Sequence, residues 1–144
     1  MSAAPLPKLP LSLDDFMGQS WDITRQILDH QQDQTLQFRG KCRITSGWYH
    51  EDGQLILKHS PPLASSRRYR WHPGVAGGID VFFEDDRFFH NIDLTQSAPV
   101  AHHFCPPDDY HVAYYFASWP DWTAHWQVSG PRKSYDMRSC YRKT

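Results

Sequence analysis

From residue 19 onward, short β-rich segments alternate with turn signals, and this pattern restricts the fold more than any other feature. The segments include LILKH (55–59), IDVFF (79–83) and YHVAYYFAS (110–118), with no ten-residue helical pattern between them. The turn signals are EDGQ (51–54), SPPL (60–63), HPGVAGG (72–78), EDDR (84–87), CPPDD (105–109), WPDW (119–122) and SGPRK (129–133). Short strands joined by tight turns predict an antiparallel sheet.

The way this sheet closes follows from its number of strands and from the polar residues on its inner face. In the clearest strand, apolar residues at 36, 38, 42 and 44 alternate with polar or charged residues at 37, 39, 41 and 43. About nine or ten such strands must form a barrel or a sandwich, because open edges invite aggregation. Polar residues at inward positions, such as Arg25 and His90, favour a barrel, since a dry sandwich core would leave them unpaired. We therefore predict an all-β protein with a single antiparallel, closed or nearly closed β-barrel.

A short helix is predicted before the first strand. Ser12 and Asp15 have the spacing of a capping box, and Gly18 is a stop signal within two turns. Residues 1–11, which contain the proline-rich MSAAPLPKLP, are predicted to be a flexible leader. Residues 12–144 are predicted to form one barrel domain, because a chain of 144 residues suits a single core.

Charge argues against a nucleic-acid partner. The chain has 15 Lys and Arg against 16 Asp and Glu, a formal net charge of -1, so no global basic field exists. The segment RRYRW (67–71) mixes cations with aromatic residues, but alternation places Arg68 and Arg70 on the face opposite Arg67. We expect a strand with one solvated face there, and no binding to nucleic acid.

Cysteine usage and apolar runs bear on location. Three cysteines cannot all pair within one chain, and the N-terminus lacks a basic stretch followed by an apolar run. No apolar run approaches the ~20 residues that a membrane-spanning helix needs. We therefore expect a soluble, cytoplasmic protein without a membrane partner, either a monomer or a homodimer.

The C-terminal half carries motifs that resemble a known family. They lie in DDRFFHNIDL, HHFCPPDDYHVAYYF and WPDWTAHWQVSGPRKSYDMRSCYR, and comprise Phe89, His90, His103, Cys105, Asp108, Tyr110, Trp122, Trp126, Gly130 to Lys133, Tyr135, Met137, Ser139 and Tyr141. Upstream matches are Trp21, Arg25, Gly40, Tyr69 and Trp71. This set resembles an uncharacterised bacterial family, the domain of unknown function 6314. One departure is Asp86, where the family commonly has glycine in an Asp-Gly-Arg turn.

The resemblance implies a lipocalin-like barrel of the calycin type, preceded by a short helix, and it implies no established activity. In calycin barrels an arginine of the last strand often covers a tryptophan of the first. The resemblance therefore implies that Arg138 or Arg142 lies over Trp21, near Gly18.

The inward-facing polar residues predict a small-molecule site. The candidate ligand-binding residues are Arg25, Tyr69, His90, His103, Tyr114, Trp126, Tyr135, Ser139 and Tyr141. Hydroxyls, imidazoles and a guanidinium within an aromatic wall suit an amphipathic ligand. A buried Arg25 requires an anionic partner, either on the ligand or from Asp29 or Glu84. We predict a binding protein for an amphipathic, anionic small molecule, whose polar head contacts Arg25, His90 and Tyr141.

The segment HHFCPPDDYH (102–111) leaves other functions open. His103 and Cys105 share one face of a strand, which permits an enzyme of the same barrel, with His90 as a further catalytic candidate. A metal would need additional ligands from Asp108, His111 or His90, and the spacing matches no zinc motif. We expect no metal, haem or other cofactor, and a hairpin corner at CPPDD. A third possibility is a structural or interaction protein with a filled barrel.

Overall fold

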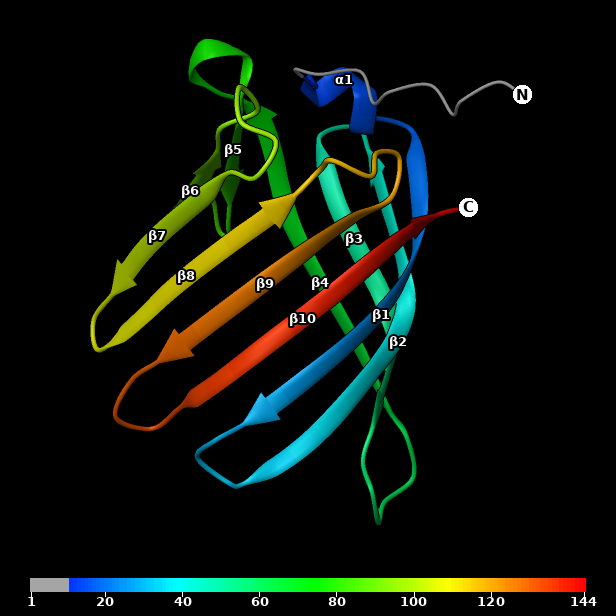
Figure 1. Ribbon diagram of the computed structural model, residues 1–144, viewed down its shortest axis with the longest axis vertical. Coiled ribbons are helices and arrows are strands. Elements are labelled where there is room, and N and C mark those ends of the chain that lie inside the picture. Colours follow the sequence, from blue (N-terminus) through cyan, green and yellow to red (C-terminus); the bar gives the residue numbers. More distant parts are fainter. Residues whose placement is uncertain (1–10) are drawn as a thin grey trace.

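The computed structural model describes residues 11–144, which form a nearly closed antiparallel β-barrel with one short helix at one end (Figure 1). The described residues contain ten strands: β1 (Gln19–Asp29), β2 (Gln34–Thr45), β3 (Trp48–Ile56), β4 (Leu63–Pro73), β5 (Ile79–Phe82), β6 (Phe88–Ile92), β7 (Val100–Cys105), β8 (Asp108–Tyr115), β9 (Trp122–Ser129) and β10 (Ser134–Lys143). This confirms the predicted fold class.

The helix α1 (Leu13–Phe16) begins where the sequence predicts it. The Asp15 carboxylate accepts a hydrogen bond from the backbone amide of Ser12 at 2.8 Å, as in a capping box. A 3-10 turn, η1 (Val75–Gly77), joins β4 to β5. Within residues 11–144, neither helical segment has the length and apolar character required to cross a bilayer. The predicted leader falls outside the described residues except for Leu11, which is buried in the core.

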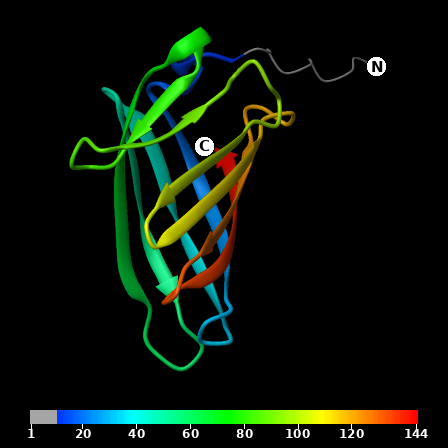
Figure 2. The same ribbon diagram turned by 90° about the vertical axis from the view of Figure 1, so that its left-hand side faces the viewer.

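The strands follow the order β6-β5-β4-β3-β2-β1-β10-β9-β8-β7, and every ladder is antiparallel. The end strands β6 and β7 approach each other without a ladder between them in the described chain, so the barrel is nearly closed (Figure 2). The hairpins β1–β2, β3–β4, β7–β8 and β9–β10 all turn at the end opposite α1 (Figure 1). The barrel therefore has a helix end and a hairpin end.

One predicted turn is wrong. EDGQ (51–54) lies inside β3, and the chain turns instead at Ser46 and Gly47, which both have positive φ angles of 53° and 80°. Gly53 is paired with Gly40 of β2, and a Cβ on Gly53 would collide with the carbonyl oxygen of Arg39. Glycine is needed here because two strands approach closely, not because the chain reverses.

Aromatic side chains fill the helix end. Phe16 of α1 is fully buried, and its ring centroid lies 5.4 Å from that of Trp71, 4.6 Å from that of Trp119 and 6.0 Å from that of Trp122. The helix thus closes this end of the barrel by inserting one large ring.

The first tryptophan of the barrel is covered by a different cation from the one implied by the family resemblance. Lys143 Nζ, rather than a guanidinium of Arg138 or Arg142, lies 5.9 Å from the ring centroid of Trp21. Both arginines occupy exposed positions of β10, where alternation turns them to the outer face.

Candidate ligand cavity

A cavity occupies the interior between the plugged helix end and the hairpin end. It measures about 640 Å³, including space open to solvent at its mouth. Its wall is mainly aromatic, and the rings come from Tyr49, Tyr69, Trp71, Phe89, Tyr110, Tyr114, Trp122, Trp126, Tyr135 and Tyr141. Charged and imidazole groups are contributed by Arg25, Glu51, Arg67 and His90. A mostly apolar cavity with few polar groups is typical of small-molecule sites.

Arg25 of β1 anchors a buried polar network beside this cavity. Its Nη1 and Nη2 atoms donate to the two carboxylate oxygens of Glu51 at 2.7 and 2.9 Å, and Nε donates to Ser139 Oγ at 2.6 Å. Tyr49 donates to Glu51 at 2.5 Å, and the Tyr49 and Tyr141 hydroxyls lie 2.7 Å apart. Because the Tyr49 hydroxyl donates its one hydrogen to Glu51, the Tyr141 hydroxyl is the donor between the two tyrosines. The buried charged and hydroxyl groups of this network therefore find their hydrogen-bond partners within the network.

The anionic partner of Arg25 is Glu51, so the sequence-based choice of Asp29 or Glu84 is wrong. Asp29 instead accepts backbone amides in the β1–β2 turn, and Glu84 is an exposed residue near Arg68. Glu51 was overlooked because EDGQ reads as a turn, whereas in the structure it is an inward position of β3. A guanidinium already paired with a carboxylate in bidentate fashion does not require a ligand anion.

The electrostatics of the network follow from burial and pairing. Burial alone would raise the pKa of Glu51, but its hydrogen bonds and charge interaction with Arg25 outweigh burial and lower it. Burial raises the pKa of the Tyr49 and Tyr141 hydroxyls well above their usual range. Glu51 is thus an anion and both tyrosines are neutral donors near neutral pH.

His90 of β6 is buried and neutral. Burial, with a smaller contribution from His103, lowers the pKa of His90 to about 3. Its Nε2 pairs with the Tyr114 hydroxyl at 2.9 Å, whereas Nδ1 has no hydrogen-bond partner among the described residues. Trp122, which also lines the cavity, likewise has a buried Nε1 without an acceptor in the described part of the chain. Two wall residues therefore each have an unsatisfied ring nitrogen.

Cationic and hydroxyl groups gather toward the hairpin end of the cavity. Arg67 is exposed, and its Nη1 donates to the Tyr69 hydroxyl at 3.4 Å. Within residues 11–144 it forms no ion pair, and its favourable charge interaction is with Glu51, a carboxylate that Arg25 already pairs in bidentate fashion. On the opposite wall, Lys133 donates to the Tyr110 hydroxyl at 3.1 Å and lies 3.2 Å from Asp108. Arg67 is thus a cation at the mouth without a counterion of its own.

The proposed catalytic pair, His103 and Cys105, lies on one face of β7, as alternation predicts. The His103 ring packs 5.3 Å from Phe89 and 5.9 Å from Phe83, centroid to centroid. In the described chain, neither the imidazole nor the thiol forms a hydrogen bond, so no group orients one toward the other. Neither residue lines the cavity.

Comparison with known proteins identifies the family. A family model described as a family of unknown function (DUF6314) matches residues 16–143. The chain belongs to this family. No curated protein matched the chain. Among solved structures, the S-type phycobiliprotein lyase CPES from Guillardia theta is similar, with a TM-score of 0.60 at 9% identity, over 96% of this chain and 98% of that chain. At this identity the similarity supports the fold alone.

Within this member of DUF6314, the structure brings together most of the residues singled out from the sequence. All the candidate ligand-binding residues line the cavity except His103 and Ser139. Sequence reasoning missed Tyr49, Glu51 and Tyr110 as wall residues, and it gave Arg67 no role inside the barrel. Arg67 and Tyr69 share a parity, which was the available signal for its inward position.

Proposed function

We propose that this protein binds an amphipathic, anionic small molecule in the cavity of its barrel. The observation that carries this proposal is an aromatic cavity, open to solvent, at whose mouth the guanidinium of Arg67 forms no ion pair within residues 11–144. An anion that pairs with this guanidinium gains a hydrogen bond to a charged group, which contributes about 1.5–3 kcal/mol.

The polarity of the wall gives the ligand an orientation. The charged end lies at the mouth, where Arg67 has no counterion and Tyr135 adds a hydroxyl. The apolar part packs against Phe89, Trp126 and Met137. Arg25 lines the cavity but is already neutralised by Glu51, so we assign the ligand's anionic group to Arg67 and retain Arg25 as part of the wall.

Fluorescence titration with 1-anilinonaphthalene-8-sulfonate, an aromatic anion, tests this proposal. Losing a hydrogen bond to a charged group costs about 1.5–3 kcal/mol, so Arg67→Gln is expected to raise the dissociation constant at least about tenfold. Arg67→Lys keeps the charge and is expected to have a smaller effect. Ala124→Leu, which adds volume at a buried wall position, is expected to weaken binding as well.

Arg68→Gln is the matched control, because Arg68 is the next residue and its guanidinium lies outside, 4.3 Å from the ring centroid of Trp48. Near-UV circular dichroism of each variant checks that its tertiary packing is intact, because partly unfolded states also bind the dye. Equal affinity in Arg67→Gln, Ala124→Leu and the control would place the dye outside the cavity and refute the proposal. Native mass spectrometry of the purified chain then identifies any small molecule that copurifies.

A further inference from the structure

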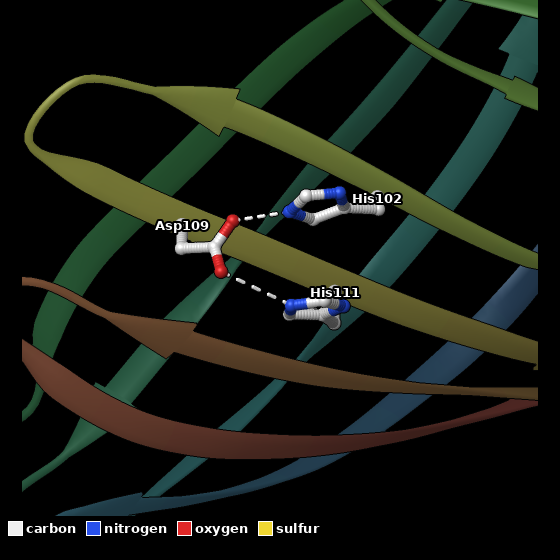
Figure 3. A group of neighbouring side chains, drawn as sticks. All are labelled: His102, Asp109 and His111. Carbon is white, nitrogen blue, oxygen red and sulfur yellow. Dashed lines mark hydrogen bonds and ion pairs between the residues drawn. The ribbon is translucent and has the colours of Figure 1, made fainter.

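A second cluster of chemically active side chains lies on the outer face of the barrel, away from the cavity. His102 of β7 is directly opposite His111 of β8 in the strand register. Asp109 precedes His111 by two residues, so alternation places it on the same face of β8. Figure 3 shows the carboxylate of Asp109 pointing toward both imidazoles. We call these three residues the outer triad.

The outer triad is arranged so that its ligand atoms converge. One carboxylate oxygen of Asp109 pairs with His102 Nε2, and the other lies 3.2 Å from His111 Nε2 (Figure 3). The two imidazole rings stack with centroids 4.3 Å apart and an angle of 14°. One ligand atom from each residue lies within 4.8 Å of the others. Cross-strand pairing, not a flexible loop, sets this spacing.

Two imidazole nitrogens and a carboxylate oxygen are ligands that zinc prefers. Zinc bonds of about 2.0–2.2 Å place neighbouring tetrahedral ligand atoms about 3.3 Å apart, so small side-chain rotations are sufficient to enclose the ion. The side chains of His102 and His111 are each 53% exposed, and that of Asp109 is 35% exposed. A fourth position therefore faces solvent.

We propose that the outer triad is a binding site for Zn²⁺ or a similar divalent transition metal. The ion takes the place of the hydrogen bonds between the Asp109 carboxylate and the two imidazoles, and all three side chains coordinate it instead. It clamps β7 to β8, and β7 is the end strand whose other edge has no ladder with β6 in the described chain. The sequence pattern pointed to Asp108, His111 or His90 as additional ligands beside the inward pair, whereas the outer triad joins His111 to His102 and Asp109.

Another group of the same composition provides an internal comparison. Asp136 lies 2.9 Å from His30 Nε2 and 3.8 Å from His125 Nε2, also on the outer face. Within residues 11–144, the outer triad is the single group of three such residues whose ligand atoms all lie within 4.8 Å of one another. His30 is 53% exposed and paired with an aspartate, as His102 is. His30→Ala is therefore a matched control.

The test is calorimetric titration of the chelator-treated full chain with zinc chloride at neutral pH. The wild type is expected to bind one equivalent. His102→Ala and His111→Ala are each expected to weaken binding at least about tenfold, since even losing an outer-shell partner costs about 10–100-fold. His30→Ala is expected to leave the affinity unchanged. Cys105→Ser is expected to do the same, which excludes the thiol of Cys105 as a ligand.

A residue-specific readout accompanies the titration. Zinc is expected to shift the imidazole NMR resonances of His102 and His111, and to leave those of His30 in place. It is also expected to raise the melting temperature of the wild type but not of His102→Ala. A dissociation constant weaker than about 1 mM, or equal affinity in the wild type and both triad variants, would overturn the proposal. Because the triad lies outside the cavity, either result is independent of dye binding there.

Discussion

Replacing Glu51 with glutamine is expected to destabilise the barrel strongly. The substitution keeps the side-chain volume but removes the negative charge and one of the two oxygens that accept from Arg25. The guanidinium is then left in the interior, where Arg25 is 8% exposed, without a counterion. Tyr49 also loses a charged acceptor. The cost comes from the charge left unpaired and is larger than the net worth of the pair.

The expected magnitude follows from the burial of the pair. Removing one partner of a buried ion pair costs about 3–5 kcal/mol of the free energy of unfolding. With an unfolding entropy of about 2.1 cal/mol/K per residue, a chain of 144 residues loses about 3 °C in melting temperature for each kcal/mol. Glu51→Gln is thus expected to lower the melting temperature by about 9–15 °C. Urea denaturation at pH 7, with the slope compared between variants, measures the free energy directly.

The double variant Arg25→Met with Glu51→Leu distinguishes the cost of losing the ion pair from the cost of leaving the Arg25 charge unpaired. Replacing a buried pair with apolar residues of similar volume is often neutral or stabilising, so the double variant is expected to be more stable than Glu51→Gln. A loss below about 1 kcal/mol for Glu51→Gln would refute this reasoning. It would mean that the guanidinium of Arg25 finds another partner when residue 51 is neutral.

Three further perturbations have defined outcomes. Because the pKa of His90 is lowered to about 3, its contribution to stability is complete above the unfolded-state value of about 6.5 and is lost as pH falls toward 3. His90→Gln is therefore expected to flatten the fall in urea stability from pH 7 to pH 5, and an unchanged slope contradicts the assignment. Cys42 is buried, and burial raises the pKa of its thiol. Ellman's reagent is therefore expected to modify the exposed Cys140 promptly and Cys42 only on unfolding. Prompt reaction of both thiols would disprove the burial of Cys42. In Gly53→Ala the added Cβ meets the Arg39 carbonyl oxygen, so the substitution is expected to lower the free energy of unfolding by about 1–3 kcal/mol, measured by urea denaturation. Wild-type stability would rule out the close approach of β2 and β3 at this residue.

The sequence by itself determined the fold class and which side of the sheet most residues face. Alternation in residues 36–44 has a period of two, and a strand has the same period, so the apolar positions had to share the buried face. The capping residues of α1 and the turn residues after β5 are local signals, and local signals can be read without knowledge of neighbours. The family motifs pointed to the same barrel.

The tertiary structure alone decided which inward residues meet. Arg25 and Glu51 are 26 residues apart on β1 and β3, and alternation gives the face of a residue but not its partner across two ladders. A glycine such as Gly53 is expected both in a turn and where two paired strands approach closely, and only the register with β2 distinguishes the two cases. The outer triad likewise depends on the β7–β8 register, which sets His102 opposite His111. The proposed sites in this barrel therefore depend on strand register, because register brings distant side chains within bonding distance.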